Sequence, residues 1–494
     1  TSTALLGKYF NQLNLEYEIY IPDRKTEGYG PSIKGFEKLI DNGAKIIFTV
    51  DCGTLSFKAI EYAKSKNIDV IVLDHHQSEI NLPKAYSVIN PNRLDDKSNL
   101  QYLCAAGVTF MFLVSINKQL RSLSWFKNNS LKEPNLINFL DLVSLGTVCD
   151  VVPLIGLNRA IVKQGLKIFK LKRNLGIKTL LDICNIEANP SIYHLGYILG
   201  PRINAGGRVG KCSHGANLLL NNNPKEVFRL ASELDQYNKE RKMLENDLIE
   251  KILTKTKIEL NDPIIILKGK NWHEGIIGIV ASRLKDKYNK PTIIISLNGK
   301  LGKASARSIA GFDIGSAIIA ATQKKILIKG GGHKMAGGFS IDISNFENFK
   351  KFIFNRFKKI NNKIEQNKPL LLDSKIAPSA INLEFYNKIY TLSPFGAGNP
   401  EPKFFLENLK SINSKIIGDK HIKSILIGPE GTVVKTIAFN ATNSEIGAYL
   451  LKKNKNLFNI AGKLSLNEWR GQRNVEFIID DISVNKDKKN TVPS

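Results

Sequence analysis

Two apolar segments that each end in polar residues constrain the fold of this chain more than any other feature. Residues 45–50 lead directly into Asp51, and residues 68–73 lead into the Asp-His-His segment at 74–76, with a helix-length segment between them. Short apolar runs that alternate with helical segments are typical of a parallel, doubly wound α/β sheet. Ligands of such sheets bind at the carboxyl ends of the strands, so we expect Asp51 and His75 to face one crevice.

A third acidic residue, Asp150, interrupts the apolar segment 142–153, where a carboxylate is costly unless it binds a cation or a hydrogen-bond donor. With Asp51 and His75 it would form a site of carboxylates and imidazole, which suits Mn²⁺ or Mg²⁺ better than Zn²⁺. The alternatives stay open, because an Asp at a strand end often caps a helix and a buried His often belongs to the core.

The rest of the chain divides into further parts. A strand is expected at residues 17–21, and from Pro224 apolar residues three and four apart predict a long helix that connects two bodies without belonging to a core. Short strands with Gly and Asn turns near the end are typical of an OB-like barrel. The expected parts are a doubly wound α/β domain (1–223), a connecting helix (224–260), a smaller α/β domain (261–361), the barrel (369–484) and a tail (485–494).

The charge of the chain points to a polyanionic partner. Lys and Arg (71) outnumber Asp and Glu (45), which gives a net charge of +26. This excess favours nucleic acid first and an anionic membrane second, although a compositional bias toward Lys, Asn and Ile would also produce it. The longest apolar stretch, near residues 107–116, is far shorter than the roughly 20 residues of a membrane-spanning helix. We therefore expect a cytoplasmic protein without a membrane partner.

The cysteines are expected to have no ligand role. All five are scattered without a CxxC pair, which argues against a disulfide framework and a zinc ribbon and favours a reducing compartment. Cys52 and Cys149 adjoin two of the candidate carboxylates on segments expected to be extended. Their thiols would then point to the opposite face and serve packing.

Further motifs appear in order along nearly the whole chain. The segment 74–76, with residues 49–53 and 144–154, resembles the DHH phosphoesterase superfamily, whose smaller α/β domain is called DHHA1. The full set resembles the RecJ family of bacterial single-strand-specific 5′→3′ exonucleases. The segments that narrow the resemblance are residues 27–30, 199–208, 272–281, 305–308 and 331–338. The loop 392–402 is also similar to that family, and we assign it a shaping role only.

The resemblance implies a site for two Mn²⁺ or Mg²⁺ ions that activate a water for attack on a phosphodiester. Asp51 matches the bridging carboxylate, and His75 and Asp150 match ligands of the second ion. His76 matches the histidine that faces the scissile phosphate. Asp74 is expected to orient His75, because metal-bound His usually needs such a partner.

The resemblance also raises an expectation about the start of the chain. RecJ-like proteins carry an Asp-x-Asp motif immediately upstream of a Thr-Ser-Thr-Ala-Leu helix, and the present sequence begins at that Thr. The motif ligates the first metal ion. We therefore expect Thr1–Ser494 to be a fragment with a weakened first metal site and impaired cleavage.

Several residues are expected to bind the substrate. Ser305 and Arg307 are two apart, so on a strand they share a face and clamp one phosphate, and the resemblance assigns them, with Arg24, to the 5′-terminal phosphate. The alternative for Arg307 is a surface ion pair. Tyr29, between two glycines, is expected either to stack on a base or to pack in a turn.

Glycine-rich segments supply the other candidates in this part. Gly332 and His333 follow Gly330 and Gly331, where backbone amides are expected to meet an anion at a helix N-terminus, unless the segment is only a tight turn. A loop interrupted by glycines would let the backbone approach a nucleotide strand. Its candidate substrate-binding residues are Arg202, Asn204 and Arg208.

In the expected barrel, a hairpin at residues 462–473 combines one aromatic residue with basic residues, which suits single-strand binding on an OB fold. The alternative is that its Trp caps the barrel. The candidate nucleic-acid-binding residues are Lys463, Trp469, Arg470 and Arg473.

The leading hypothesis is a metal-dependent exonuclease that releases 5′-mononucleotides from single-stranded DNA in repair and recombination. The alternatives are a DHH phosphodiesterase for oligoribonucleotides or cyclic dinucleotides, and a nucleic-acid-binding relative without catalysis. The long helix and the extra barrel favour the exonuclease, because small-substrate relatives generally have two domains. The expected partner is single-stranded DNA, bound by a monomer. The resemblance also raises single-strand-binding protein and a RecQ-type helicase as partners.

Overall fold

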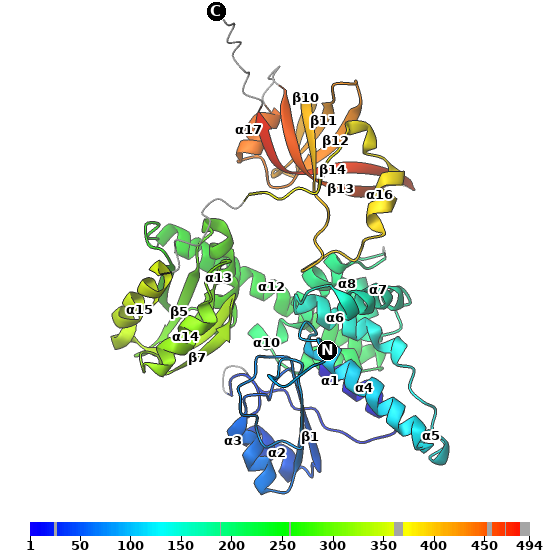
Figure 1. The fold of residues 1–494 in the computed structure, drawn as a ribbon, viewed down its shortest axis with the longest axis vertical. Helices are drawn as coiled ribbons and strands as arrows, with labels where there is room; N and C mark the ends of the chain where they lie inside the picture. Colours follow the sequence, from blue (N-terminus) through cyan, green and yellow to red (C-terminus); the bar gives the residue numbers. More distant parts are fainter. Residues whose placement is uncertain are drawn as a thin grey trace, which may run out of the picture. The chain divides into compact units, whose positions relative to one another are not determined.

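The structure is a computed structural model of the chain, and it describes residues 1–23, 27–187, 189–255, 258–359, 369–451, 457–469 and 471–484. The chain forms two compact units (Figure 1). The first comprises Thr1–Val152 and Ala160–Asn367, and the second comprises Pro153–Arg159 and Lys368–Ser494. Within the described ranges, no helix is both long enough and apolar enough to cross a membrane.

The first unit begins with a parallel sheet of β1 (Ile46–Val50), β2 (Asp69–Leu73) and β3 (Ser87–Ile89), in that order. The register pairs Val50 with Leu73 and Leu73 with Ile89, so the strand ends are level. This confirms the predicted parallel βαβ unit, with α3 (Phe57–Ser65) as its crossover helix.

Helices cover both faces of this sheet because its side chains alternate between them. On one face, Ile47 and Val70 pack with Phe36 of α2 (Ile33–Asp41) and Ile60 of α3. On the other face, Phe48 contacts a residue from each of α1 (Ser2–Gln12) and α4 (Ala105–Ser122), namely Phe10 and Phe112.

The expected strand at residues 17–21 is wrong, since no strand occurs there in the described structure. Tyr17 packs its ring on Phe10, with centroids 5.9 Å apart, and the Tyr20 hydroxyl donates to Glu27 at 2.5 Å. Side-chain contacts, and not a strand ladder, hold this segment.

A helical body completes the first domain, around a core that includes Leu142, Leu180, Leu199, Leu219 and Leu230. Each of these side chains is at most 1% exposed. The elements of this body are α5 (Trp125–Asn128), η1 (Leu136–Phe139), α6 (Leu140–Cys149), α7 (Gly156–Lys170), α8 (Leu175–Ile183), the π-helical turn η2 (His194–Leu199), α9 (Gly200–Ile203), α10 (Gly206–Val209) and α11 (His214–Leu220).

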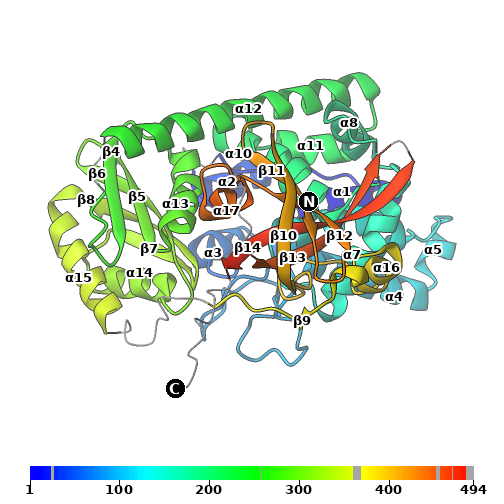
Figure 2. The same cartoon turned by 90° about the horizontal axis from the view of Figure 1, so that it is seen from above.

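The long helix α12 (Pro224–Lys255) is present, but it belongs to two cores and does not only connect them (Figure 2). Val227 and Leu234 pack into the helical body, and Leu248 and Ile252 pack into the next domain. Its apolar stripe is buried at both ends, which is why the expectation of a mere connector is wrong.

The second domain of this unit contains a mixed sheet with the order β4-β5-β6-β8-β7, in which only β4 and β5 are parallel. Helix α13 and the end of α12 pack on one face of the sheet, and α14 and α15 pack on the other. The elements are β4 (Ile265–Lys270), α13 (Glu274–Tyr288), β5 (Thr292–Asn298), β6 (Leu301–Arg307), α14 (Ile314–Gln323), β7 (Lys329–His333), β8 (Ala336–Asp342), η3 (Ile343–Asn345) and α15 (Phe346–Lys358).

The second unit contains a closed barrel of five strands, as predicted. The ladder runs β11-β12-β14-β13-β10, and an additional pairing of β10 with β11 closes it. The elements are β9 (Ser374–Lys375), η5 (Pro378–Ala380), α16 (Leu383–Tyr390), β10 (Phe404–Ile417), β11 (His421–Ile427), β12 (Val433–Ala438), α17 (Glu445–Leu451), β13 (Phe458–Trp469) and β14 (Gln472–Val484).

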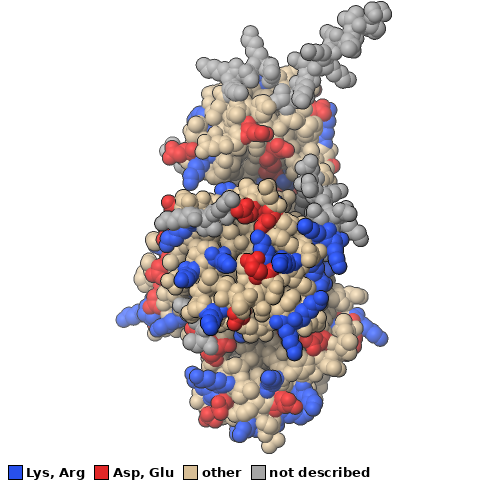
Figure 3. Space-filling view, turned by 90° about the vertical axis from the view of Figure 1, so that its left-hand side faces the viewer, with Lys and Arg blue, Asp and Glu red and all other residues tan. Residues whose placement is uncertain are grey.

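The positive charge is spread over the face of the molecule that Figure 3 shows. Figure 3 shows Lys and Arg scattered across the visible face, with fewer Asp and Glu between them. A distributed excess of this kind attracts a polyanion over a wide area, but it does not mark one binding site.

Candidate active site

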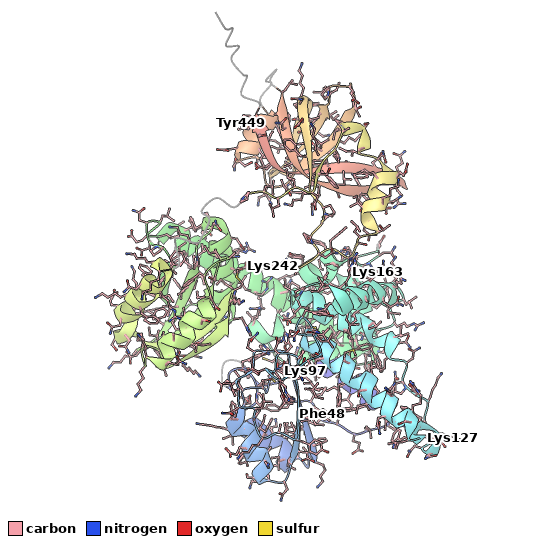
Figure 4. All side chains as sticks on the ribbon, in the orientation of Figure 1. Phe48, Lys97, Lys127, Lys163, Lys242 and Tyr449 are labelled. Atoms are coloured by element: carbon pink, nitrogen blue, oxygen red, sulfur yellow. The ribbon has the colours of Figure 1, made fainter. Side chains whose placement is uncertain are left out.

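Three side chains of the first unit converge where two strands and a helix end. Asp51 follows β1, His75 follows β2, and Asp150 caps the end of α6. Phe48, which is labelled in Figure 4, marks the position of β1. The Nε2 atom of His75 lies 3.2 Å from Asp51 Oδ1 and 3.4 Å from Asp150 Oδ2. His75 therefore lies next to both carboxylates, as the pattern of strand ends predicts for Asp51 and His75. Among the described residues, Asp51, His75 and His76 have ligand atoms that all lie within 4.8 Å of one another.

Asp51 lies in a backbone conformation that L-residues rarely adopt, with φ at +62°. Its N–H donates to the carbonyl of Leu73 at 3.0 Å, so pairing with β2 continues into this residue. The hydroxyl of Tyr29 donates to the Asp51 carbonyl at 2.5 Å. Residues held in such conformations gather at functional sites, where their surroundings fix them.

The electrostatics of the cluster favour a cation. Burial raises the pKa of Asp150 to about 6, with the charge of His75 opposing this shift and the charge of Asp51 adding to it. Burial disfavours a charged His75, but the hydrogen bond to Asp51 and the charge of Asp150 outweigh burial and raise the pKa of His75. Both shifts mean that this site attracts positive charge.

The geometry fits a divalent cation. Donors at adjacent positions around an ion, each roughly 2.1 Å from it, lie roughly 3 Å apart, close to the 3.2 and 3.4 Å found around His75 Nε2. Carboxylate oxygen combined with imidazole nitrogen suits Mn²⁺ or Mg²⁺. The side chains of Asp51 and Asp150 are 53% and 41% exposed, so the site is open to a substrate.

Asp74 holds the ring of His76, and the expectation that it orients the His75 ring is wrong. Its Oδ1 atom lies 2.7 Å from His76 Nδ1, whereas from His75 it accepts the backbone N–H, at 2.8 Å, and not the ring. The rings of two adjacent residues point in different directions, and that of His75 turns toward Asp51 and Asp150. The hydrogen bond to Asp74 raises the pKa of His76.

Residues that the sequence did not single out hold this loop. Thr54 donates to Asp74 Oδ2 through its hydroxyl at 2.7 Å and its N–H at 3.1 Å. The Asn90 side chain donates to the carbonyl of His76 at 2.8 Å, and that of Asn92 donates to the carbonyl of His75 at 2.6 Å. The sequence did contain a sign of their role, because these two Asn residues follow the strand β3 as Asp51 follows β1, at the edge of the sheet where the site lies.

His333 reaches the same site from the second domain. Its ring stacks on that of His76, with centroids 5.4 Å apart and planes 27° from parallel. Burial and the charge of His76 lower the pKa of His333. Gly332 and His333 lie on the strand β7, paired with Gly337 and Ala336, so the expected helix N-terminus at this segment is wrong.

A separate cavity of about 470 Å³ brings together several predicted substrate-binding residues. Tyr29, Arg208, Ser305 and Arg307 line it, together with glycines of α13. Arg307 donates to Ser305 Oγ at 3.2 Å and to the carbonyl of Ala306 at 2.8 Å, so the two side chains share a face of β6 as predicted. Burial lowers the pKa of Arg307. A desolvated guanidinium with neutral partners binds an anion strongly.

Tyr29 lies between this cavity and the cluster of Asp51, His75 and Asp150. It lines the cavity, its hydroxyl bonds the Asp51 carbonyl, and its ring meets His76 edge-on with centroids 6.0 Å apart. Tyr29 is 61% exposed, so it is accessible to a base.

Arg202 and Asn204 do not line the cavity. Arg202 donates to Asp235 Oδ1 on α12 at 2.8 Å and to the carbonyl of Ile198 at 2.9 Å, and Asn204 caps α9. The expected loop around them is wrong, because α9 and α10 form short helical turns there.

Cys149 ends the helix α6, so the expected extended segment is also wrong at this residue. Burial raises the pKa of Cys52 and of Cys149 to about 12, which keeps both as thiols. Both cysteines therefore remain assigned to packing.

The predicted hairpin of the barrel is present, with Glu468 opposite Arg473 and Trp469 opposite Gln472. Lys463 pairs with Glu401 at 2.6 Å, and Arg473 pairs with Glu468 at 2.7 Å. Arg24, Arg470 and the side chain of Trp469 lie outside the described residues.

Known families match three parts of the chain. They are described as the DHH family, N-terminal domain (residues 1–147), the DHHA1 domain (residues 261–359) and the RecJ OB domain (residues 372–481). The first range covers the three-stranded sheet and the helices up to α6, the second covers the domain that contains β4 to β8, and the third covers the strands of the barrel.

Individual proteins match almost the whole chain. The single-stranded-DNA-specific exonuclease RecJ of Escherichia coli is 34% identical over 98% of this chain and 85% of its own length. Crystal structures of RecJ from Thermus thermophilus with Mn²⁺ and with Mg²⁺ are 26% identical, with TM-scores of 0.81 and 0.74. This chain spans 66% and 65% of those two chains, and they cover 98% and 97% of it. The chain therefore belongs to the RecJ family of single-stranded-DNA-specific exonucleases.

Proposed function

We propose that this protein is a metal-dependent 5′→3′ exonuclease that hydrolyses single-stranded DNA to 5′-mononucleotides. One observation carries the proposal: Tyr29 contacts both the Asp51–His75–Asp150 cluster and the cavity lined by Arg307. A terminal phosphate held in that cavity would lie next to a site for divalent ions. This juxtaposition suits cleavage close to a phosphorylated strand end.

Asp51, His75 and Asp150 would hold Mn²⁺ or Mg²⁺. The bound ions supply Lewis-acid activation of water and stabilise the charge that develops on the phosphodiester. His76 offers its Nε2 atom to the scissile phosphate, because Asp74 occupies Nδ1. The hydrogen bond to Asp74 also raises the pKa of this imidazole, which favours its charged form and suits contact with an anion.

Arg307, Ser305 and Arg208 would bind the 5′-terminal phosphate. The cavity includes Gly275 and Gly278 in the first turns of α13, whose backbone dipole favours an anion. A Cβ atom at Gly278 would lie 2.8 Å from Ser305 Oγ and 3.1 Å from Arg307 Nη2. A side chain at position 278 would therefore crowd both groups, and the glycine leaves space beside them for an anion.

His333 and Gly332 would close the site from the second domain, and the barrel would hold the trailing strand through Lys463 and Arg473. We assign the protein to DNA repair and recombination in the cytoplasm, where free cysteines such as Cys52 and Cys212 persist. Single-strand-binding protein and a RecQ-type helicase are the proposed partners.

A strand labelled at either end and offered with a 5′-phosphate or a 5′-hydroxyl tests this function. We expect Mn²⁺-dependent release of mononucleotides from the 5′ end, faster with the phosphate, and loss of release in Asp150→Asn. Degradation that begins at the 3′ end would refute the polarity. Equal hydrolysis of dinucleotides and long strands would favour a small-substrate phosphodiesterase.

A further inference from the structure

Two tyrosines on the surface of the helical body stack on each other. Tyr193 and Tyr197 are 60% and 73% exposed. Their ring centroids lie 5.4 Å apart, and the ring planes are 25° from parallel. Aromatic side chains that serve a core are largely buried, so core packing does not account for this pair. The pair is instead accessible to a ligand.

The backbone that carries the pair has an unusual conformation. Tyr193 immediately precedes the π-helical turn η2, and Tyr197 belongs to it. Turns of this kind are rare and occur frequently at functional sites. His194 Nδ1 accepts the N–H of Ser191 at 2.9 Å, and the His194 ring meets that of Tyr193 edge-on, with centroids 5.8 Å apart. Contacts with the rings of His194 and Tyr197 therefore orient Tyr193.

The turn η2 packs on the last turn of α6, which ends at Asp150, and both belong to the first unit. Cys149 Sγ donates to the carbonyl of Leu195 at 3.5 Å. A Cβ atom at Gly196 would lie 3.3 Å from Val148 Cγ1, so the glycine permits a close approach of the two helices. The stacked tyrosines thus stand on a turn that contacts the residues directly before Asp150.

The proposed function leaves one part of the substrate without a binding surface in this unit. The 5′-terminal phosphate would lie in the cavity of Arg307, and Tyr29 is accessible to the base next to it. The nucleotides on the 3′ side of the scissile bond would extend from the metal site in another direction. Their unpaired bases expose apolar faces, which stack on aromatic side chains whatever the sequence.

We propose that Tyr193 and Tyr197 form a stacking platform for bases of single-stranded DNA on the 3′ side of the scissile bond. A base extends the stack that the two rings already make. This inference rests on the proposed function, which places the scissile phosphate next to Asp150. The net charge of +26 attracts the strand to the protein, and the platform adds an attraction that depends little on salt.

The test substitutes Tyr197→Leu and Tyr193→Leu, which each remove a ring but keep an apolar side chain. Tyr197→Phe keeps the ring and loses only the hydroxyl. The matched control is Tyr86→Leu in the same unit, because Tyr86 is also 73% exposed. Tyr86 precedes β3, at the edge of the parallel sheet opposite to the strand ends beside Asp51 and His75.

Binding of a 5′-phosphorylated single strand is measured by fluorescence anisotropy on the metal-free full chain, so that the strand stays intact. Loss of one base–ring stack should weaken binding about 5- to 150-fold in Tyr197→Leu and Tyr193→Leu. Tyr197→Phe and Tyr86→Leu should bind within about twofold of the wild type. The salt slope should be the same in all variants, because no phosphate contact is lost.

Strands with one abasic nucleotide at successive positions locate the platform. At a position 3′ of the scissile bond, loss of the base should weaken binding to the wild type about as much as Tyr197→Leu does. The same loss should have little further effect in Tyr197→Leu, because the base and the ring act as a pair. Binding of every strand as in Tyr86→Leu, or equal losses on intact and abasic strands at every position, would overturn the inference.

Asp150→Asn separates this inference from the proposed function. If it loses Mn²⁺-dependent cleavage while Tyr197→Leu and Tyr193→Leu bind the strand as the Tyr86→Leu control does, the platform is wrong and the proposed function stands. If Asp150→Asn cleaves like the wild type, the proposed metal site is wrong, and the inference that places the strand by that site is overturned with it.

Discussion

The carboxylate of Asp74 lies 2.7 Å from Nδ1 of His76, and only 1% of Asp74 is exposed. Burial alone would raise the pKa of this carboxyl group, but hydrogen bonds from His76 and Thr54 outweigh burial and lower it. Asp74 is therefore ionised and fixed at neutral pH. It sets the ring orientation of His76.

This geometry predicts that Asp74→Asn impairs cleavage but not metal binding. We expect turnover to fall about 100-fold, because the amide neither fixes the tautomer of His76 nor stabilises its charge. Mn²⁺ affinity, measured by calorimetry, should change by less than about threefold. Asp69→Asn, at the exposed start of the same strand, is the control. A loss of Mn²⁺ affinity as large as the loss of turnover would assign Asp74 to the metal itself.

Arg307→Gln should reduce the preference for a 5′-phosphate. The guanidinium is desolvated, so its contact with a phosphate is worth about 1.5–3 kcal/mol, or roughly 10- to 150-fold in KM. Strands with a 5′-hydroxyl should be affected little. Arg121→Gln, which breaks an exposed ion pair with Glu133, serves as the control. Equal losses on both kinds of strand would contradict the terminal-phosphate assignment.

We predict that Asp141, which is not part of the active site, makes the free energy of unfolding depend on pH. Burial raises its pKa from 3.8 to about 6, so the folded state binds a proton that the unfolded state releases between these values. The stability that the protonated Asp141 contributes to the folded state is complete below about pH 4 and is lost as the pH rises to about 6. Asp141→Asn should therefore raise the free energy of unfolding near pH 7, by at most about 3 kcal/mol.

Urea unfolding of the wild type and Asp141→Asn from pH 4 to pH 7 measures this effect. The difference between the two proteins should be small at pH 4 and should grow to its full size by about pH 6 to 7. The repulsion within a chain of net charge +26 is nearly the same in the wild type and in Asp141→Asn, so it largely cancels when their free energies of unfolding are subtracted. A difference that stays constant with pH would show that Asp141 titrates normally.

The barrel offers a pair of variants with opposite expected signs. Arg473 pairs with Glu468 on the hairpin, and exposed pairs of this kind exchange partners readily. Arg473→Gln should weaken single-strand binding and reduce the salt slope by about one, whereas Glu468→Gln should release Arg473 and tighten binding. Fluorescence titrations at several salt concentrations measure both. Shifts in the same direction would remove this hairpin from the binding surface.

Sequence patterns predicted the features of this fold that are local. The apolar runs before Asp51 and Asp74 specified two adjacent strands, and level strand ends brought Asp51 and His75 together. Likewise, alternation along β6 was enough to place Ser305 and Arg307 on one face.

The sequence patterns did not predict the features that depend on residues far apart in the sequence. The glycine-rich segment before His333 became a strand because Gly337 and Gly338 pair with it, and no local signal distinguishes that outcome from a helix N-terminus. Similarly, the choice of Asp74 between two adjacent histidines depends on Thr54 and Asn90, which other elements supply. The anchoring of Leu154 by Ala397 joins residues more than two hundred positions apart.

The central claim is that Asp51, His75 and Asp150 form the divalent-metal site of a nuclease, and a Mn²⁺ titration of Asp51→Asn tests it most directly. Calorimetry of the metal-free protein and cleavage of a 5′-phosphorylated single strand are measured on the same samples, with Asp69→Asn as the control. We expect Asp51→Asn to lose Mn²⁺ binding and cleavage together, while its affinity for single-stranded DNA and its thermal midpoint stay within error of the control. Wild-type Mn²⁺ affinity, or substantial turnover at saturating Mn²⁺, in Asp51→Asn would contradict the claim.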